Sequence, residues 1–158
     1  MSELAHDQFA TASWQGNYDT YSVGPGEDTK LIRISLEASA DDLALNDTFK
    51  FIYLDSGTVV LGGWLTTDAI DSGGTAAVID IGYDPDTAAA DPDFFVNGSA
   101  ASARNVPFIA GLGAASAPFV SADGDNYFVT GLVQTAPTTA AAGTITVSLL
   151  LGCAQDYT

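Results

Sequence analysis

Hydrophobic and polar residues alternate along most of this chain from about residue 30 onward. In the segment KLIRISLE, which begins at Lys30, aliphatic side chains occupy every second position and polar or charged ones lie between them. A period of two places the aliphatic side chains on one face of a strand. Comparable segments recur between turns rich in Gly, Asp and Pro, and they predict strands at 30–37, 49–55, 58–68, 75–83, 126–134 and 144–151.

Two of these strands carry a specific expectation about the buried face. In FKFIYLD the alternation groups Phe49, Phe51 and Tyr53 on one side. In the segment that follows a predicted turn at Gly73-Gly74, one face collects the residues Ala77, Ile79, Ile81 and Tyr83. Each set is expected to point into the core.

The strand predicted at 58–68, TVVLGGWLTTD, is apolar but contains Gly62-Gly63. Two adjacent glycines inside a strand indicate a bulge or a close approach of another backbone. Trp64 follows them within the apolar run, and we interpret it as a core residue.

The number and spacing of these strands predict an all-β fold, a β-sandwich or jelly-roll-like barrel with at most one short helix. That helix is expected in DPDFFVNG, with Asp91 as N-cap, Pro92 at the first helical position and Gly98 beyond the end. A weaker strand signal lies within the Ala- and Gly-rich stretch at 101–121. Residues 30–158 are expected to form a single domain.

The first 29 residues lack a sustained period and are mostly polar. They predict an extended N-terminal arm that becomes ordered by lying on its own domain or on a neighbour. Aromatic side chains are the residues most enriched at interface hot spots. The candidate partner-binding residues are therefore the aromatic ones of the arm, Phe9, Trp14, Tyr18 and Tyr21.

The charge of the chain limits its partners. Twenty acidic residues stand against four basic ones, which gives a formal net charge of −16. Nucleic-acid binding requires clustered Lys and Arg, and an anionic membrane surface repels such a chain, so neither partner is expected.

The N-terminal residues show no basic region followed by an apolar run, which predicts synthesis in the cytoplasm without secretion.

Residues for catalysis are scarce. The single histidine, His6, lies in the arm, and the single cysteine, Cys153, lies at a strand end, where we expect a small buried side chain. A nucleophile without a positioned base does not support hydrolysis, and two such residues do not make a zinc site. We therefore expect neither an enzyme nor a bound cofactor.

The acidic segment DIGYDPDTAAADPDFF offers candidate metal ligands, and Asp123 and Asp125 in the segment DGDN offer further carboxylates. The weak candidates for a calcium site that we single out are Asp84, Asp86, Asp91 and Asp93. The segment lacks the glycine and the terminal glutamate of an EF-hand loop, and its prolines favour turns. Our preferred interpretation is a solvated acidic loop that binds no metal.

Four segments resemble the capsid decoration, or cement, proteins of tailed bacteriophages. They are DSGTVVLGGWLTTD at 55–68, TAAVIDIGYDPD at 75–86, DPDFFVNGSA at 91–100 and TAAAGTITVSLLL at 139–151. In those proteins a similar apolar strand with a glycine precedes a VDIG strand, an acidic dipeptide and a final AGT strand. The resemblance covers residues 49–151 and leaves the arm outside.

The resemblance implies a β-sandwich or jelly-roll subunit without enzymatic activity, present in many copies on the outer surface of the virion. Its partner would be the major capsid protein, whose neighbouring subunits it would bridge. Such proteins are commonly trimers, so a homo-oligomer is expected, with a trimer favoured.

Two alternatives remain open at this stage. The chain could serve elsewhere in the virion, as a head–tail joining, tail or fibre-base component. It could instead be a carbohydrate-binding module that uses Trp64 or Trp14 as a platform for a sugar ring.

Overall fold

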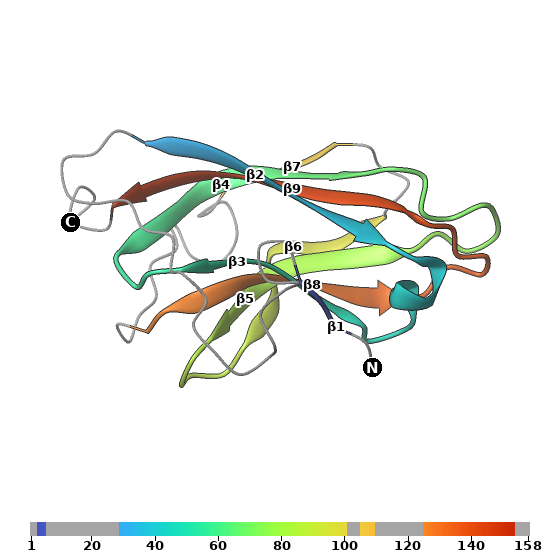
Figure 1. Cartoon of the computed structure of the whole chain (residues 1–158), viewed down its shortest axis with the longest axis horizontal. Helices are drawn as coiled ribbons and strands as arrows, with labels where there is room; N and C mark the ends of the chain where they lie inside the picture. Colours follow the sequence, from blue (N-terminus) through green and yellow to red (C-terminus); the bar gives the residue numbers. More distant parts are fainter. Residues whose placement is uncertain (1–2, 6–28, 101–104, 110–124, 154–158) are drawn as a thin grey trace.

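The structure is a computed structural model that describes residues 3–5, 29–100, 105–109 and 125–153. These residues form two facing β-sheets (Figure 1). One sheet has the strand order β1 (Glu3–Ala5), β3 (Thr48–Leu54), β8 (Tyr127–Thr135), β5 (Val78–Pro85) and β6 (Asp91–Ala100). The other has the order β2 (Lys30–Ala38), β9 (Gly143–Cys153), β4 (Thr58–Thr67) and β7 (Val106–Ile109).

The pairing of the strands is nested along the chain. Strand β5 pairs with β6, β4 with β7, β3 with β8 and β2 with β9, all antiparallel. Successive pairs alternate between the two sheets, so the chain is one long folded hairpin wound into a sandwich. This is the jelly-roll arrangement, and it confirms the predicted all-β fold.

Strand β1 lies at the edge of the five-stranded sheet, where it pairs in parallel with β3. Its residues belong to the predicted N-terminal arm, so this short part of the arm lies on the chain's own sheet. The candidate partner-binding residues Phe9, Trp14, Tyr18 and Tyr21 lie outside the described residues.

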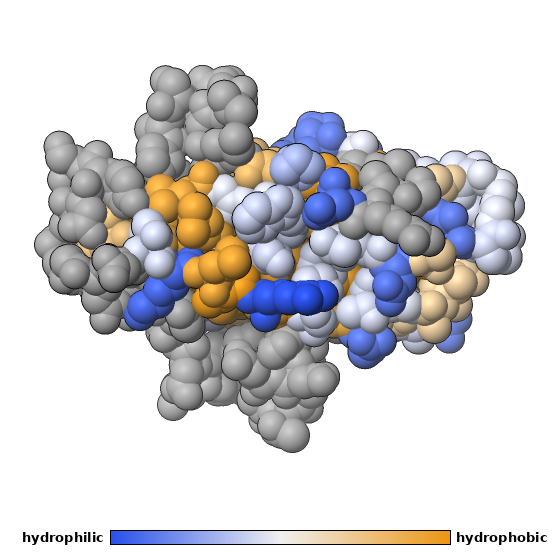
Figure 2. Space-filling view, turned by 90° about the horizontal axis from the view of Figure 1, so that it is seen from above, coloured by the Kyte–Doolittle hydropathy of each residue, from blue (hydrophilic) through white to orange (hydrophobic). Residues whose placement is uncertain are grey.

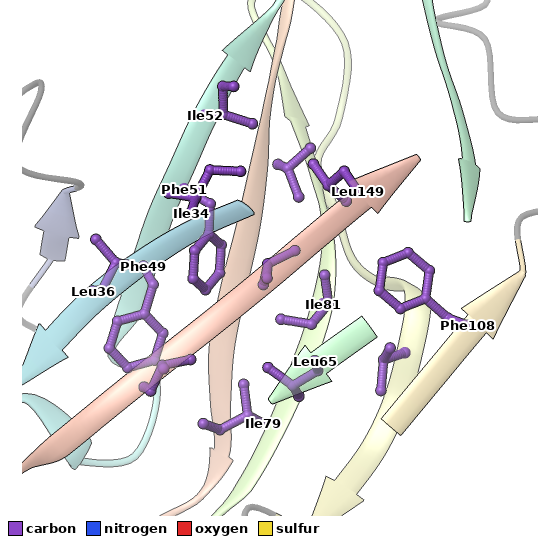
Figure 3. Packing of buried hydrophobic residues seen from close by; sticks show 14 of the residues in the cluster. Ile34, Leu36, Phe49, Phe51, Ile52, Leu65, Ile79, Ile81, Phe108 and Leu149 are labelled. Carbon is purple, nitrogen blue, oxygen red and sulfur yellow. The ribbon is translucent and has the colours of Figure 1, made fainter. Parts of the chain in front are cut away.

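The core fills the space between the sheets with aliphatic and aromatic side chains from both (Figure 3). Phe49 and Phe51 of β3, Ile81 of β5 and Leu149 of β9 are fully buried there. At the edge of the core, the hydroxyl of the fully buried Tyr127 donates to the carbonyl oxygen of Thr58 at 2.8 Å, so this polar group is satisfied.

A bulge in β3 changes which side chains face the core. The pairing with β8 shifts between Lys50 and Ile52, so Phe51 is the extra residue. Ile52 and Leu54 are buried after it, and Tyr53 points outward. The prediction that Tyr53 shares the buried face of Phe49 and Phe51 is therefore wrong, because a strict period of two does not pass through a bulge.

The short helix predicted at Asp91–Gly98 is also wrong, because these residues belong to strand β6. Pairing with β5 jumps from Ile81–Val96 to Tyr83–Asp91, so four β6 residues lie opposite one residue of β5. The bulge places Phe94 and Phe95 against Tyr83, with ring centroids at 5.3 and 6.5 Å. Packing of two adjacent aromatic rings on the sandwich edge outweighs the local capping signal, and an edge strand tolerates proline.

The one helical element among the described residues is a 3-10 turn, η1 (Ala40–Leu43), which lies between β2 and β3. The carboxylate of Asp42 accepts hydrogen bonds from the backbone N–H of Ser39 at 2.8 Å and from its hydroxyl at 2.5 Å. No helix among the described residues is long and apolar enough to cross a membrane.

Candidate interaction surface

The outer face of the β2-β9-β4-β7 sheet changes in character from one end to the other. Its outward side chains form rows across the strands, because antiparallel register places them opposite one another. Leu31 lies opposite Leu150 at one end, and Glu37 lies opposite Thr144 at the other. Figure 2, which views the molecule from the side of this sheet, shows apolar residues gathered towards one end beside strongly polar ones.

Three exposed hydrophobic side chains define what we call the apolar patch: Leu31, Leu150 and Trp64. They are 63%, 36% and 39% exposed, respectively. Only one other large hydrophobic among the described residues is comparably exposed, Leu45 at 57%. Gly62 of β4 lies opposite Leu150 and carries no side chain to cover it. Clustered exposed apolar side chains mark an interaction site more often than scattered ones do.

Trp64 is on the outer face because of a second bulge, and its interpretation as a core residue is wrong. The pairing of β4 with β9 shifts between Val60 and Gly62, so Leu61 is an extra residue. Val60 faces the core before this bulge and Leu65 after it. Without the bulge, Trp64 would have followed Val60 into the core. The prediction of a bulge near the glycine pair is itself confirmed.

The second glycine of the pair, Gly63, allows a close approach inside the sheet. A Cβ atom at this position would lie 2.1 Å from the carbonyl oxygen of Ser148 and 2.7 Å from Cζ of Phe108. Glycine therefore lets the Phe108 ring fill the core directly under β4. The backbone next to Trp64 is fixed as a result.

A shallow depression adjoins the apolar patch. Its volume is about 380 Å³, and it is lined by Arg33, Trp64, Thr66, Asn105 and Ser148. Arg33 and Trp64 lie in one row on either side of Ser148. The depression thus combines an indole ring, a guanidinium group and small hydroxyl and amide groups.

Arg33 has no carboxylate within ion-pair distance among the described residues. This is unusual in a chain with twenty acidic residues. On the described strands, no Asp or Glu shares the outward rows from Leu31 to Ser35. The nearest acids along the face are used locally: Glu37 accepts from the Thr144 hydroxyl at 2.9 Å.

The outer face of the β1-β3-β8-β5-β6 sheet has a contrasting arrangement. The Tyr53 and Phe128 rings pack with centroids 4.6 Å apart. The Lys50 ammonium lies 4.4 Å from the centre of the Phe128 ring and 3.8 Å from Oδ2 of Asp84. The Tyr53 hydroxyl donates to Asp86, and burial followed by this hydrogen bond raises the pKa of the phenol. Aromatic and charged groups on this face are therefore paired within the chain.

The four weak candidates for a metal site are spread over β5, the residue that follows it and β6. Asp84 lies beside Lys50, and Asp86 accepts from Tyr53. Asp91 and Asp93 lie in β6, where burial and the neighbouring Asp93 raise the pKa of Asp91. Among the residues that the structure describes, no three His, Cys, Asp or Glu side chains are arranged to hold a metal ion.

Asp80 is a buried acid that the sequence did not single out. It is 2% exposed, and its Oδ1 accepts the backbone N–H of Gly98 at 2.6 Å. Gly98 has φ +70°, a conformation that favours glycine. Burial raises the pKa of Asp80, the Asp93 charge adds to the rise, and the Gly98 hydrogen bond opposes it. Asp80 therefore holds Gly98 at a second irregularity of the β5–β6 pairing, which lies between the Ile79–Ser99 and Ile81–Val96 pairs. Cys153 is buried, as expected.

Comparisons with known proteins agree on the fold. The chain is similar to a chain in a structure of the capsid of Ralstonia phage GP4, with a TM-score of 0.69 and 20% sequence identity over 95% of this chain and 97% of that one. It is also similar to a chain in the capsid asymmetric unit of cyanophage Pam1, with a TM-score of 0.62 and 22% identity over 90% and 96%. No family model and no curated protein matches the sequence. Both structures share the jelly-roll fold of this chain.

Proposed function

We propose that this chain is a virion structural protein, a capsid decoration or cement protein of a tailed bacteriophage. It would bind the outer surface of the shell and bridge neighbouring subunits of the major capsid protein. The observation that carries this proposal is the full-length likeness to chains from two phage capsid structures. Each alignment covers nearly all of this chain and nearly all of the similar chain, so the two similar chains have nearly the same length as this one.

The charge of the chain fits a place on the outside of the shell. A net charge of −16 repels the packaged genome, and a protein on the outer surface has no need to touch DNA. A protein that binds the assembled shell but not its free subunits shifts the equilibrium towards the shell. Stabilisation by adhesion requires no catalytic residue.

Two features of the chain are available for attachment. One is the apolar patch with Arg33. The other is the N-terminal arm, whose aromatic residues Phe9, Trp14, Tyr18 and Tyr21 remain our proposed anchors because large rings supply interface energy at low entropic cost. A trimer would bring three copies of both features to one site on the shell.

The test is binding of the purified full-length chain to shells that lack it. Such shells come from a phage deleted for this gene or from the major capsid protein expressed alone. We expect saturable co-sedimentation with many copies per shell, and density for the chain on the outer surface in electron cryomicroscopy. A chain found as one ring at the portal or in the tail would instead support the head–tail or tail alternative.

One observation favours a second candidate function. Trp64 is exposed beside hydroxyl, amide and guanidinium groups, an arrangement that could hold a sugar ring on the indole face. A carbohydrate-binding module would show a change in tryptophan emission on titration with its sugar. The capsid proposal takes precedence because it accounts for the whole fold rather than for one side chain.

A further inference from the structure

We infer that the apolar patch and Arg33 together form the surface that faces the shell, and that the shell subunit presents apolar side chains with a carboxylate opposite Arg33. This inference rests on the proposed function and names the contact that it uses. It assigns the docking face to the β2-β9-β4-β7 sheet rather than to the opposite sheet.

The first argument is the distribution of charge. The acids of this chain, whose net charge is −16, repel any carboxylate of a partner that comes near them. On the described strands the outward rows from Leu31 to Ser35 carry no acid, and they hold three of the four most exposed large hydrophobics. Contact at this place therefore buries apolar area with the least repulsion.

The second argument is that Arg33 has no ion-pair partner among the residues that the structure describes. A guanidinium covered by a partner without a counter-charge loses its hydration and gains nothing in return. Covering the apolar patch would enclose Arg33, which is in the row next to Leu31 and Leu150. The partner must therefore supply a carboxylate, and the planar guanidinium can bind one through two parallel hydrogen bonds.

The third argument is the depression between Arg33 and Trp64. Its volume of about 380 Å³ accepts a protruding side chain, and Thr66, Asn105 and Ser148 line it with small polar groups. An Asp or Glu side chain entering here would place its carboxylate at Arg33 and its aliphatic part against the indole ring. The depression thus fits the carboxylate that Arg33 requires.

The size of the apolar patch favours the shell over a second copy of the chain. Even a fully accessible aromatic side chain buries only about 250 Å². Three partly exposed side chains therefore fall short of the roughly 800 Å² per partner of a stable standard interface. Attachment to a shell can combine this contact with others, such as the arm, and gain from their linkage.

The experiment measures co-sedimentation of full-length variants with shells that lack the chain. Leu31→Ser with Leu150→Ser is expected to weaken binding about tenfold or more, and Arg33→Gln about tenfold. The matched controls are Leu45→Ser, an exposed leucine outside the apolar patch, and Lys50→Gln, which changes net charge by the same amount on the other sheet. Both controls are expected to bind within about twofold of the wild type.

A second measurement uses the unaltered chain. Hydroxyl-radical footprinting reports the accessibility of individual side chains, and we expect Trp64 and Leu31 to become protected on shells while Leu45 does not. Normal binding by the apolar-patch and Arg33 variants, or unchanged labelling of Trp64, would overturn the inference and leave the proposed function intact.

Three other outcomes are distinguishable. A wild-type chain that does not bind shells at all would overturn the proposed function and this inference with it. A wild-type dimer in sedimentation analysis that Leu31→Ser with Leu150→Ser converts to monomers would assign the apolar patch to a second copy. Quenching of Trp64 emission by a uronic acid, with shell binding blocked by that sugar only in the wild type, would assign the depression to a glycan. The last two results would also overturn the inference.

Discussion

The outer faces of the two sheets differ in how their aromatic residues are packed. In each case a bulge turns an aromatic side chain out of the expected core: Tyr53 on β3 and Trp64 on β4. Tyr53 then packs on Phe128 and donates to Asp86. Trp64 borders an open depression beside an Arg33 that has no ion-pair partner among the described residues.

The difference separates groups used for stability from groups available for binding. On the five-stranded sheet, the chain itself supplies partners for rings and charges, so their interactions contribute to folding. On the four-stranded sheet, the exposed apolar area and the guanidinium of Arg33, which has no ion pair within the described part of the chain, would contribute only when another molecule covers them. The substitutions below test this division, beginning with the largest expected effect.

Removal of one aromatic ring from each face should lower the free energy of unfolding by different amounts. Phe128 is 7% exposed and contacts Tyr53 and Lys50, so Phe128→Ala should lower the free energy of unfolding by about 3 kcal/mol. Trp64 is 39% exposed, so Trp64→Ala should cost about 1 kcal/mol or less. Urea denaturation measures both. Equal losses would show that Trp64 stabilises the fold as much as Phe128 does.

The backbone that positions Trp64 should be less tolerant than its side chain. Gly63→Ala places a methyl group against the Ser148 carbonyl and the Phe108 ring, and should cost about 2 kcal/mol through overpacking. The matched control is Gly57→Ala, where the nearest atom to an added Cβ is 3.8 Å away and the change should remain within about 0.5 kcal/mol. A neutral Gly63→Ala in thermal melts would show that β4 and β9 can separate without penalty.

The buried acid of the five-stranded sheet should make stability depend on pH. Because the pKa of Asp80 is raised above its ordinary 3.8, the folded state binds more protons than the unfolded state between pH 3.8 and that higher value. The stabilising effect of protonation is complete below this window and is lost as pH rises through it. Melting temperature should therefore increase as the pH is lowered through this window towards 3.8.

Asp80→Asn tests the origin of that slope. The amide oxygen of asparagine can still accept the Gly98 N–H, so the irregular β5–β6 pairing at Gly98 should persist while the pH dependence of stability becomes smaller. Asp41→Asn removes one exposed acid from η1 and controls for net charge. A slope that Asp80→Asn leaves unchanged would assign the pH dependence to other groups, such as Asp91.

The sequence predicted the strands because alternation is a local property that survives in single segments. The face assignments of Tyr53 and Trp64 share one physical cause of error, since both failed at bulges, where one extra residue reverses the alternation. The glycine pair beside Trp64 indicated a bulge, but not the residue at which the phase would change. The capping signal at Asp91–Pro92 failed for a different reason, because aromatic packing between strands is not visible locally.

The candidate surface could be predicted only in part. Arg33 lies in a strand whose alternation already placed it with the polar residues, whereas the outward position of Leu31 was not predicted. That Leu150 and Trp64 join them depends on the register of β9 with β2 and β4, which connects residues far apart in the sequence. The aromatic anchors proposed in the arm remain a prediction.

The smallest expected effect comes from the two cations that distinguish the faces. Lys50→Gln and Arg33→Gln each make the chain more negative by one charge, so general repulsion affects both equally. Lys50→Gln also removes the contacts of Lys50 with Asp84 and Phe128. The Lys50 and Asp84 side chains are 21% and 42% exposed, so solvent screens their attraction, and the expected loss of stability is about 0.5 kcal/mol. Arg33 has no such ion pair to lose among the described residues. At low ionic strength Lys50→Gln should therefore be the less stable variant.

Added salt should reduce the difference in stability between Lys50→Gln and Arg33→Gln. Mobile ions screen the Lys50–Asp84 attraction, and they also screen the repulsion among the acids of a chain with net charge −16. Both variants and the wild type should become more stable as salt is added, and the difference between the free energies of unfolding of the two variants should become smaller. If Arg33→Gln were instead the less stable variant at low salt, Arg33 would already contribute to the stability of the folded chain. The two faces would then not differ in the way that assigns binding to one of them.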